Sequence, residues 1–131
     1  MAAASSFLEQ LKYYRDLSTR ALLAAIPDRE PKKYLYDLIP DYPTRGGKGF
    51  RPSLCLSTCQ LYGGSETEAI RSAVALELFH NAFLVHDDIE DESIDRRGKP
   101  TLNAAHGNGI AVNVGDAMNV ISLRPLMENV F

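Results

Sequence analysis

The stretch that decides the fold runs from Ala73 to Asp91 and reads AVALELFHNAFLVHDDIED. Ten of its first thirteen residues, Ala73 to Val85, are apolar, and they fall on every side of a helix. A helix that is apolar all round is typical of a buried position. Because the same segment ends in clustered carboxylates, we expect a central buried helix whose carboxyl end carries a polar site.

Helical periodicity continues on both sides of this segment. Ser6 and Ser65 are each followed three residues later by Glu, the pattern of a capping box. Helices are predicted at 7–26, 32–38, 52–62, 65–91, after Thr101 and at 110–129, with loops at 41–50 and 96–100. We find no strand alternation, so the sequence predicts an all-α helical bundle without a sheet. This domain spans 7–131 and follows a flexible lead at 1–6.

The bulk properties exclude several classes of protein. The chain has 131 residues, 45% of them hydrophobic, and a net charge of −3, which argues against a general nucleic-acid binder. Its two cysteines, Cys55 and Cys59, lie one helical turn apart and do not indicate a disulfide framework. No apolar run reaches the roughly 20 residues that span a bilayer. Without a basic leader, the expected location is the cytoplasm.

Asp87 and Asp91 are the strongest candidates for metal ligands. They lie four residues apart, so they share a helix face, whereas Asp88 points about 100° away. Like charges at this spacing destabilise a helix end unless a cation offsets them. Mg²⁺ is suited to such a site, because it takes one or two carboxylates with waters and substrate phosphates. Taken alone, a solvated acidic helix end is an equally good interpretation.

Three further residues favour the functional interpretation. Arg96 and Arg97 follow the acids and offer planar guanidinium groups to phosphate oxygens. His80 lies two turns before Asp87, about 20° away around the helix. A lone histidine on an apolar face is more often a core residue, but this one aligns with the carboxylates.

The segment GGKGFRP, from Gly46 to Pro52, places Lys48 and Arg51 on a glycine-rich turn that enters a helix. Glycine lets backbone approach an anion closely, and a helix N-terminus favours negative charge. The spacing is not that of a phosphate-binding Walker loop. Judged in isolation, an exposed cationic turn explains this loop as well as an anion site does.

Taken together, these motifs resemble the polyprenyl synthetase family of trans-isoprenyl diphosphate synthases. The matches are Gly46-Gly47-Lys48 with Arg51-Pro52, Glu77-x-x-His80, Asp87-Asp88-x-x-Asp91, Arg96-Arg97-Gly98 and Pro100-Thr101. The resemblance covers about residues 7–131. It implies an isoprenoid-synthase type of bundle and a prenyltransferase that joins isopentenyl diphosphate to an allylic diphosphate with Mg²⁺.

The resemblance also implies roles for individual residues. Asp87 and Asp91 would hold Mg²⁺ with Asp88 in support, and Arg96 would contact the allylic diphosphate. The residues implied for isopentenyl diphosphate are Lys48, Arg51, His80 and Arg97. Bulk at Phe83 and Ala82 is associated in the family with product length. One aromatic and one small residue there imply farnesyl or geranylgeranyl diphosphate, without deciding between them.

The chain departs from the family pattern at two points. Gly49 stands where arginine is common, and no second aspartate-rich motif is present. We therefore expect a truncated part of a synthase that binds Mg²⁺-diphosphate but is not active alone. Its apolar helix faces should pair with another copy or with another synthase chain.

Two other functions remain open. A non-catalytic subunit of a heteromeric synthase is one, because the pattern Cys55-x-x-x-Cys59 resembles one linked with subunit pairing in plant geranylgeranyl diphosphate synthases. Two small core residues on one helix face would explain these cysteines as well. A fragment of a terpene cyclase is the other, and it would not need Lys48, Arg51 and His80.

Overall fold

The computed structural model describes residues 6–129, which fold as the helical array that the sequence predicts. The helices are α1 (Phe7–Ala25), η1 (Lys32–Tyr36), α2 (Asp41–Thr44), α3 (Phe50–Leu61), α4 (Glu66–Glu90), α5 (Leu102–His106) and α6 (Asn108–Met127). The predicted lead at 1–6 lies outside the described residues except for Ser6. Two helical segments differ from the prediction: η1 is a π-helical turn, and the predicted 41–50 loop contains the short α2.

The predicted helix starts are confirmed where side chains cap them. Ser6 accepts a hydrogen bond from the Glu9 N–H at 3.2 Å, and the Glu9 carboxylate accepts from the Ser6 N–H at 2.7 Å. Ser65 begins α4 with the same reciprocal pair. The Thr101 hydroxyl accepts from the Ala104 N–H at 3.2 Å and starts α5. Local sequence therefore sets these boundaries, because each cap satisfies N–H groups that a helix leaves unpaired.

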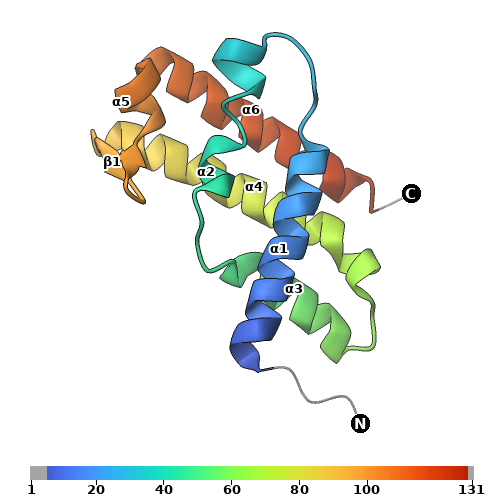
Figure 1. Ribbon diagram of the computed structural model, residues 1–131. Helices are drawn as coiled ribbons and strands as arrows, with labels where there is room; N and C mark the ends of the chain where they lie inside the picture. Colours follow the sequence, from blue (N-terminus) through green and yellow to red (C-terminus); the bar gives the residue numbers. More distant parts are fainter. Residues whose placement is uncertain (1–5, 130–131) are drawn as a thin grey trace.

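Helix α4 is the centre of the molecule (Figure 1). Helix α6 runs alongside it in the opposite direction, while α1 crosses it and α3 packs near its N-terminal half. The side chains of Leu78, Val85, Leu22 and Met118, from α4, α1 and α6, are fully buried in the main core. Helix α4 therefore packs against α1, α3 and α6, and the residues along it are positioned by this core.

The prediction that α4 is buried on all sides is wrong for the part of the chain that the structure describes. Leu76, Phe79 and Phe83 are 46%, 46% and 53% exposed. Their spacing puts them on one face of α4, away from the helices that cover the other side. The rings of Phe79 and Phe83 pack edge to face, with centroids 4.8 Å apart. An uncovered apolar face is typical of a surface that meets another element or chain.

The 96–100 loop contains a short hairpin, so the expectation of no sheet is corrected. Strands β1 (Asp95–Arg96) and β2 (Lys99–Pro100) pair antiparallel through the two-residue turn Arg97-Gly98. Both turn residues have positive φ, 54° and 77°, as a tight hairpin turn with the right-handed strand twist requires. The hairpin keeps the bundle all-α in class but fixes the direction of Arg96 and Arg97.

None of the helices between residues 6 and 129 is both long and apolar enough to cross a bilayer.

Candidate functional site

The carboxyl end of α4 presents two exposed carboxylates. Asp87 lies in the last turn of the helix, and Asp91 caps its C-terminus, with its N–H donating to the Asp87 carbonyl at 2.8 Å. Both side chains are open to solvent. They lie on one side of the helix end, as their spacing predicts.

Asp88 has a different environment from Asp87. It is 3% exposed and accepts hydrogen bonds from the Tyr42 hydroxyl at 2.6 Å and from Arg96 Nε at 2.7 Å and Nη2 at 3.0 Å. Burial, followed by the hydrogen bond to Asp88, raises the pKa of Tyr42 to about 12, so its hydroxyl stays protonated and donates. The bond to Asp88 also raises the pKa of Arg96. Two residues assigned to the same site from the sequence, Asp88 and Arg96, are thus paired with each other.

Sequence reasoning missed Tyr42 and the role of Arg45. The Arg45 side chain is 4% exposed and forms an ion pair with Asp41 at 2.9 Å. Its guanidinium donates to three carbonyl groups of the hairpin, those of Arg96, Lys99 and Pro100, at 3.1, 3.3 and 2.7 Å. In the sequence, Arg45 is recognisable only as one more cation in the basic stretch with Lys48 and Arg51. Arg45 is therefore a structural cation that holds the hairpin, and with it Arg96, beside α4.

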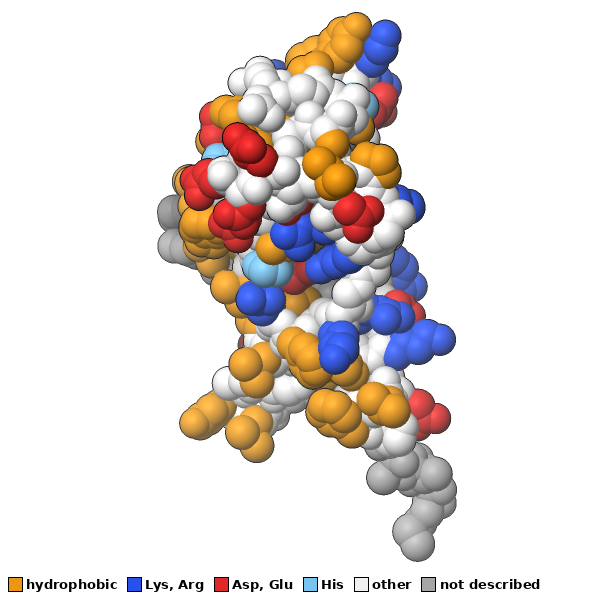
Figure 2. Space-filling view, turned by 90° about the vertical axis from the view of Figure 1, so that its left-hand side faces the viewer, with side chains coloured by type: hydrophobic (Ala, Val, Ile, Leu, Met, Phe, Trp, Pro, Cys, Tyr) orange, Lys and Arg blue, Asp and Glu red, His pale blue; other side chains and the backbone are white. Residues whose placement is uncertain are grey.

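The glycine-rich loop lies on the same side of the molecule. Figure 2 shows basic side chains and a histidine gathered in the middle of this face, with acidic side chains above and hydrophobic ones below. Lys48 and Arg51 are exposed. Arg97 is held by the loop itself, because its Nη1 donates to the carbonyl of Gly46 and, at 3.5 Å, to that of Tyr42. The loop and the hairpin, about 50 residues apart in sequence, therefore meet.

His80 lies between the two charged regions. Burial lowers its pKa, and the positive charges of Arg51, Arg97 and Arg96 lower it further, while Asp87 opposes the shift. His80 is therefore neutral at pH 7 and can donate one N–H. One turn earlier, Glu77 has its pKa raised by burial, against the opposing effects of Asn81, Arg51 and Arg97.

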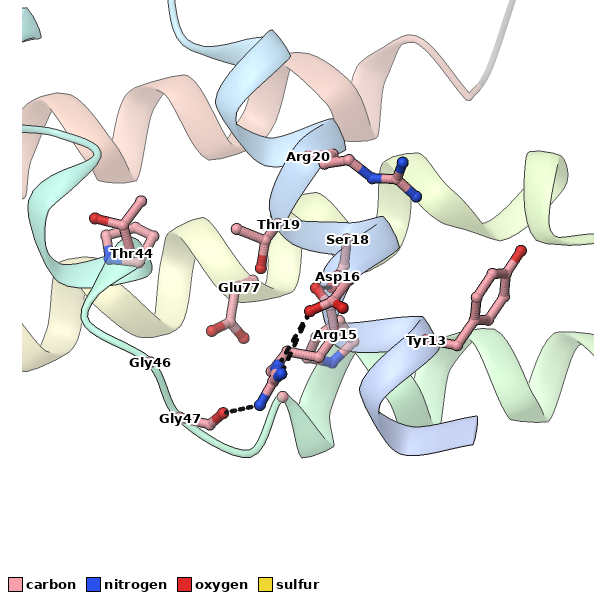
Figure 3. Close-up of a pocket in the computed structure, with 13 residues that line it drawn as sticks. Tyr13, Arg15, Asp16, Ser18, Thr19, Arg20, Thr44, Gly46, Gly47 and Glu77 are labelled. Atoms are coloured by element: carbon pink, nitrogen blue, oxygen red, sulfur yellow. Dashed lines mark hydrogen bonds and ion pairs between the residues drawn. The ribbon is translucent and has the colours of Figure 1, made fainter. Parts of the chain in front are cut away.

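A cavity of about 740 Å³ opens behind the loop (Figure 3). Its walls come from α1, from the loop and from α4, and include Arg15, Asp16, Gly47 and Glu77. The loop thus forms a thin wall, with Arg97 on one side and this cavity on the other. Because glycine has no side chain, the wall consists mainly of backbone.

The residues predicted to bind a metal do not all face one position, and neither do the two residues predicted to set product length. Between residues 6 and 129, no three His, Cys, Asp or Glu side chains converge on a possible metal position. Of the three aspartates of the motif, Asp88 is committed to Arg96, while Asp87 and Asp91 are exposed. Phe83 lies on the exposed face of α4, but Ala82 is fully buried in the main core, so the two do not share a surface.

Cys55 and Cys59 are both free and half-buried on α3. Burial raises the pKa of Cys55, and the neighbouring Cys59 adds to the shift. The Cys59 thiol donates to the Ser65 carbonyl at 3.5 Å, and a Cβ at Gly64 would lie only 2.4 Å from its sulfur. Cys59 thus packs the turn between α3 and α4.

Comparison with known proteins identifies related chains. The family model described as polyprenyl synthetase matches residues 32–129. The large subunit 1 of the heterodimeric, chloroplastic geranylgeranyl pyrophosphate synthase of Arabidopsis thaliana is 39% identical over 114 residues, covering 86% of this chain and 30% of that protein. The geranylgeranyl diphosphate synthase of Cyanophora paradoxa is 37% identical over 115 residues, covering 86% of this chain and 38% of its own length.

Solved structures agree with the sequence relatives. The geranylgeranyl pyrophosphate synthetase of Pyrococcus horikoshii superposes with a TM-score of 0.86 at 36% identity, over 92% of this chain and 36% of its own. The chain thus spans about a third of the length of these proteins. The matched region contains the glycine loop, α4 with its carboxylates and the hairpin, and on this evidence the chain belongs to the polyprenyl synthetase family.

Proposed function

We propose that this chain is the substrate-binding part of a prenyltransferase that joins isopentenyl diphosphate to an allylic diphosphate. One observation carries the proposal: Arg97 donates to the Gly46 carbonyl, which joins the basic loop to the hairpin, and the neighbouring Arg96 pairs with Asp88, next to Asp87 at the end of α4. A basic region and an acidic region side by side suit two diphosphates, one of which binds through a metal. The relatives, which are geranylgeranyl diphosphate synthases, support this substrate class.

Asp87 and Asp91 are the residues that would hold Mg²⁺. Two exposed carboxylates one turn apart fit an ion that takes one or two carboxylates and completes its shell with water and substrate phosphates. Bound there, Mg²⁺ would stabilise the charge of a departing diphosphate. Arg96 uses Nε and Nη2 on Asp88, which leaves Nη1 as the donor for the allylic diphosphate. Asp88 then acts by orienting Arg96.

Lys48, Arg51, His80 and Arg97 would bind isopentenyl diphosphate. Three of them are cations, and a neutral His80 contributes a hydrogen bond without a net charge. This basic group needs no metal, so it should bind diphosphate even when Mg²⁺ is removed. We also propose that the prenyl chain lies along the exposed Leu76, Phe79 and Phe83 face and that Phe83 limits its length to farnesyl or geranylgeranyl diphosphate.

A partner chain is the second part of the proposal. A helix from a second copy or from another synthase chain should close over the apolar face of α4 and the prenyl chain that lies along it, because water contact there is unfavourable. The name of the Arabidopsis relative, which is a subunit of a heterodimer, favours a heteromer. A non-catalytic subunit of such a heteromer is the alternative function, and the available Asp87 and Asp91 argue against it. A terpene cyclase fragment would leave the Lys48 loop without a role.

We propose that this chain alone binds diphosphates without condensing them. We also propose that it is located in the cytoplasm. A fluorescent fusion would test the location, and a plastid signal, as the names of several relatives imply for those proteins, would contradict it.

Titration calorimetry of the chain with inorganic diphosphate tests the binding function directly. With EDTA present, binding should depend on Lys48 and not on Asp87. With Mg²⁺ added, a second binding event should appear, which Asp87→Asn weakens about tenfold and Lys48→Ala leaves unchanged. Heat signals that are identical for wild type and both variants would exclude the proposed site.

A further inference from the structure

Gly49 of the basic loop lies against Arg15 of α1. It has φ +65° in the left-handed region, and a Cβ built there would lie 2.8 Å from Arg15 Cγ and 2.9 Å from Arg15 Cβ. Contacts this short do not occur between real side chains, so only glycine fits while Arg15 keeps its place. The stem of Arg15 therefore fills the space that a side chain at 49 would take.

The guanidinium of Arg15 continues across the loop. Its Nη1 donates to the Gly47 carbonyl at 3.5 Å, and Nε and Nη2 contact the Asp16 carboxylate at 3.4 Å (Figure 3). On the opposite side, Arg97 donates to the Gly46 carbonyl, and its guanidinium would meet a Cβ at Gly47 at 3.2 Å. Two arginines from distant elements thus hold two consecutive carbonyl groups of the loop.

The N–H groups of the loop have no such partners. Within residues 6–129, no hydrogen bond from the N–H of Gly46, Gly47, Lys48 or Gly49 to another residue is found. Backbone N–H groups that are exposed on a turn leading into a helix favour anions. Holding the carbonyl groups fixes the orientation of the peptide planes, and so of the N–H groups beside Lys48 and Arg51.

We propose that Arg15 is a positioning residue for the diphosphate site of the Gly46–Gly49 loop. This inference rests on the proposed function, because it assumes that the loop binds a diphosphate. Arg15 does not touch the ligand; it fixes the loop from the α1 side while Arg97 fixes it from the other. The absence of a side chain at 49 is then the condition that lets Arg15 reach Gly47.

Arg20 provides a matched control on the same helix. It is exposed, lines the same cavity and carries the same charge, but Figure 3 shows it pointing away from the loop. Arg20→Ala therefore removes an equal charge without removing the contact. Arg15→Lys keeps the charge but loses the planar group that reaches Gly47 and Asp16 together. The two variants separate a general electrostatic effect from loop positioning.

The test is calorimetric binding of inorganic diphosphate in EDTA, with thermal unfolding and amide NMR of the loop measured on the same proteins. Arg15→Ala should raise the Kd about threefold to tenfold, the range for losing one ordinary intramolecular hydrogen bond, because Arg15 acts through the loop and not on the ligand. It should also lower the order parameters of Gly46 to Gly49 without ligand. Arg20→Ala should change the Kd less than about twofold, and Arg15→Lys should fall between the two.

Each outcome decides the inference. If Arg15→Ala lowers only the unfolding temperature and leaves both the Kd and the loop order parameters unchanged, Arg15 is merely structural. If Arg20→Ala raises the Kd equally, charge alone is responsible and positioning is excluded. If wild-type chain binds no diphosphate, the proposed function fails, whereas binding that Lys48→Ala abolishes and Arg15→Ala spares overturns this inference only.

Discussion

The acidic end of α4 and the Gly46–Gly49 loop form opposite kinds of site. At the acidic end the important residues are neighbours in sequence, yet Asp88 is buried against Arg96 while Asp87 and Asp91 face solvent. At the loop, Arg15 and Arg97 come from elements far apart in sequence and hold adjacent carbonyl groups. At the acidic end, one sequence motif supplies both a buried ion pair and exposed carboxylates. At the loop, three separate segments of the chain form a single site.

The aspartates of one sequence motif can therefore have different structural roles. Helical rotation of about 100° per residue turns Asp88 towards the bundle and its neighbour outwards. The loop has no repeating geometry, so its shape depends on what packs against it. Substitutions at the acidic end should therefore separate stability from binding, whereas substitutions at the loop should affect both.

The largest expected effect is that of Asp88→Asn. Breaking a buried, hydrogen-bonded ion pair costs about 3–5 kcal/mol of folding free energy, because the remaining charge of Arg96 loses its partner. Asp87→Asn, at an exposed position one residue away, should change the unfolding free energy by less than about 0.5 kcal/mol. Urea unfolding of both variants measures the contrast. Equal losses would show that the two aspartates do not differ in role.

Gly49→Ala should have the next largest effect. Gly49 and Gly46 both have positive φ, so alanine at either position costs about 1–2 kcal/mol of strain. At Gly49 the new Cβ also overlaps Arg15, whereas nothing lies within 4 Å of a Cβ at Gly46. We expect Gly49→Ala to cost about 1–3 kcal/mol more than Gly46→Ala in urea unfolding. A larger loss from Gly46→Ala would contradict the close contact with α1.

Binding of Mg²⁺ with diphosphate should weaken about tenfold in Asp87→Asn and in Asp91→Asn, because each substitution removes one ligand oxygen. A tenfold change corresponds to about 1.4 kcal/mol of binding free energy. Asp88→Asn should weaken binding less, once titrations are corrected for the folded fraction. Calorimetry at equal Mg²⁺ concentration gives the three dissociation constants. If Asp88→Asn caused the greatest loss per folded molecule, the shared-face argument would be wrong.

The smallest effect concerns Glu77, between the two regions. Burial raises the pKa of Glu77 above the ordinary value of 4.5, so the folded chain binds this proton more tightly than the unfolded chain does. Stability is then lost as pH rises from about 4.5 through the raised pKa, and ionised Glu77 remains a cost at pH 7. Glu77→Gln should therefore stabilise the chain progressively between pH 4 and pH 7. Glu90→Gln, at an exposed position of α4, controls for the lost charge.

Much of the fold was predictable because its signals are local. Ser6, Ser65 and Thr101 cap helices by bonding N–H groups three residues away, and the structure confirms all three. The two-residue turn Arg97-Gly98 was missed, since arginine at positive φ is uncommon and no alternating strands flank it. The exposure of Phe83 was also missed. An apolar pattern shows that a side chain favours burial, but it does not show whether a neighbouring helix is present to cover it.

Sequence by itself determined the all-α class, the family, and the expectation that Asp87 and Asp91 share one side of a helix end, since helical geometry relates residues four apart. Only the tertiary structure decided that Asp88 pairs with Arg96, that Tyr42 completes this pair, and that Arg15 lies against Gly49. Those contacts join residues 8, 46 and 34 positions apart, and their distances depend on how α1, α2 and the hairpin pack against α4. No local period carries that information.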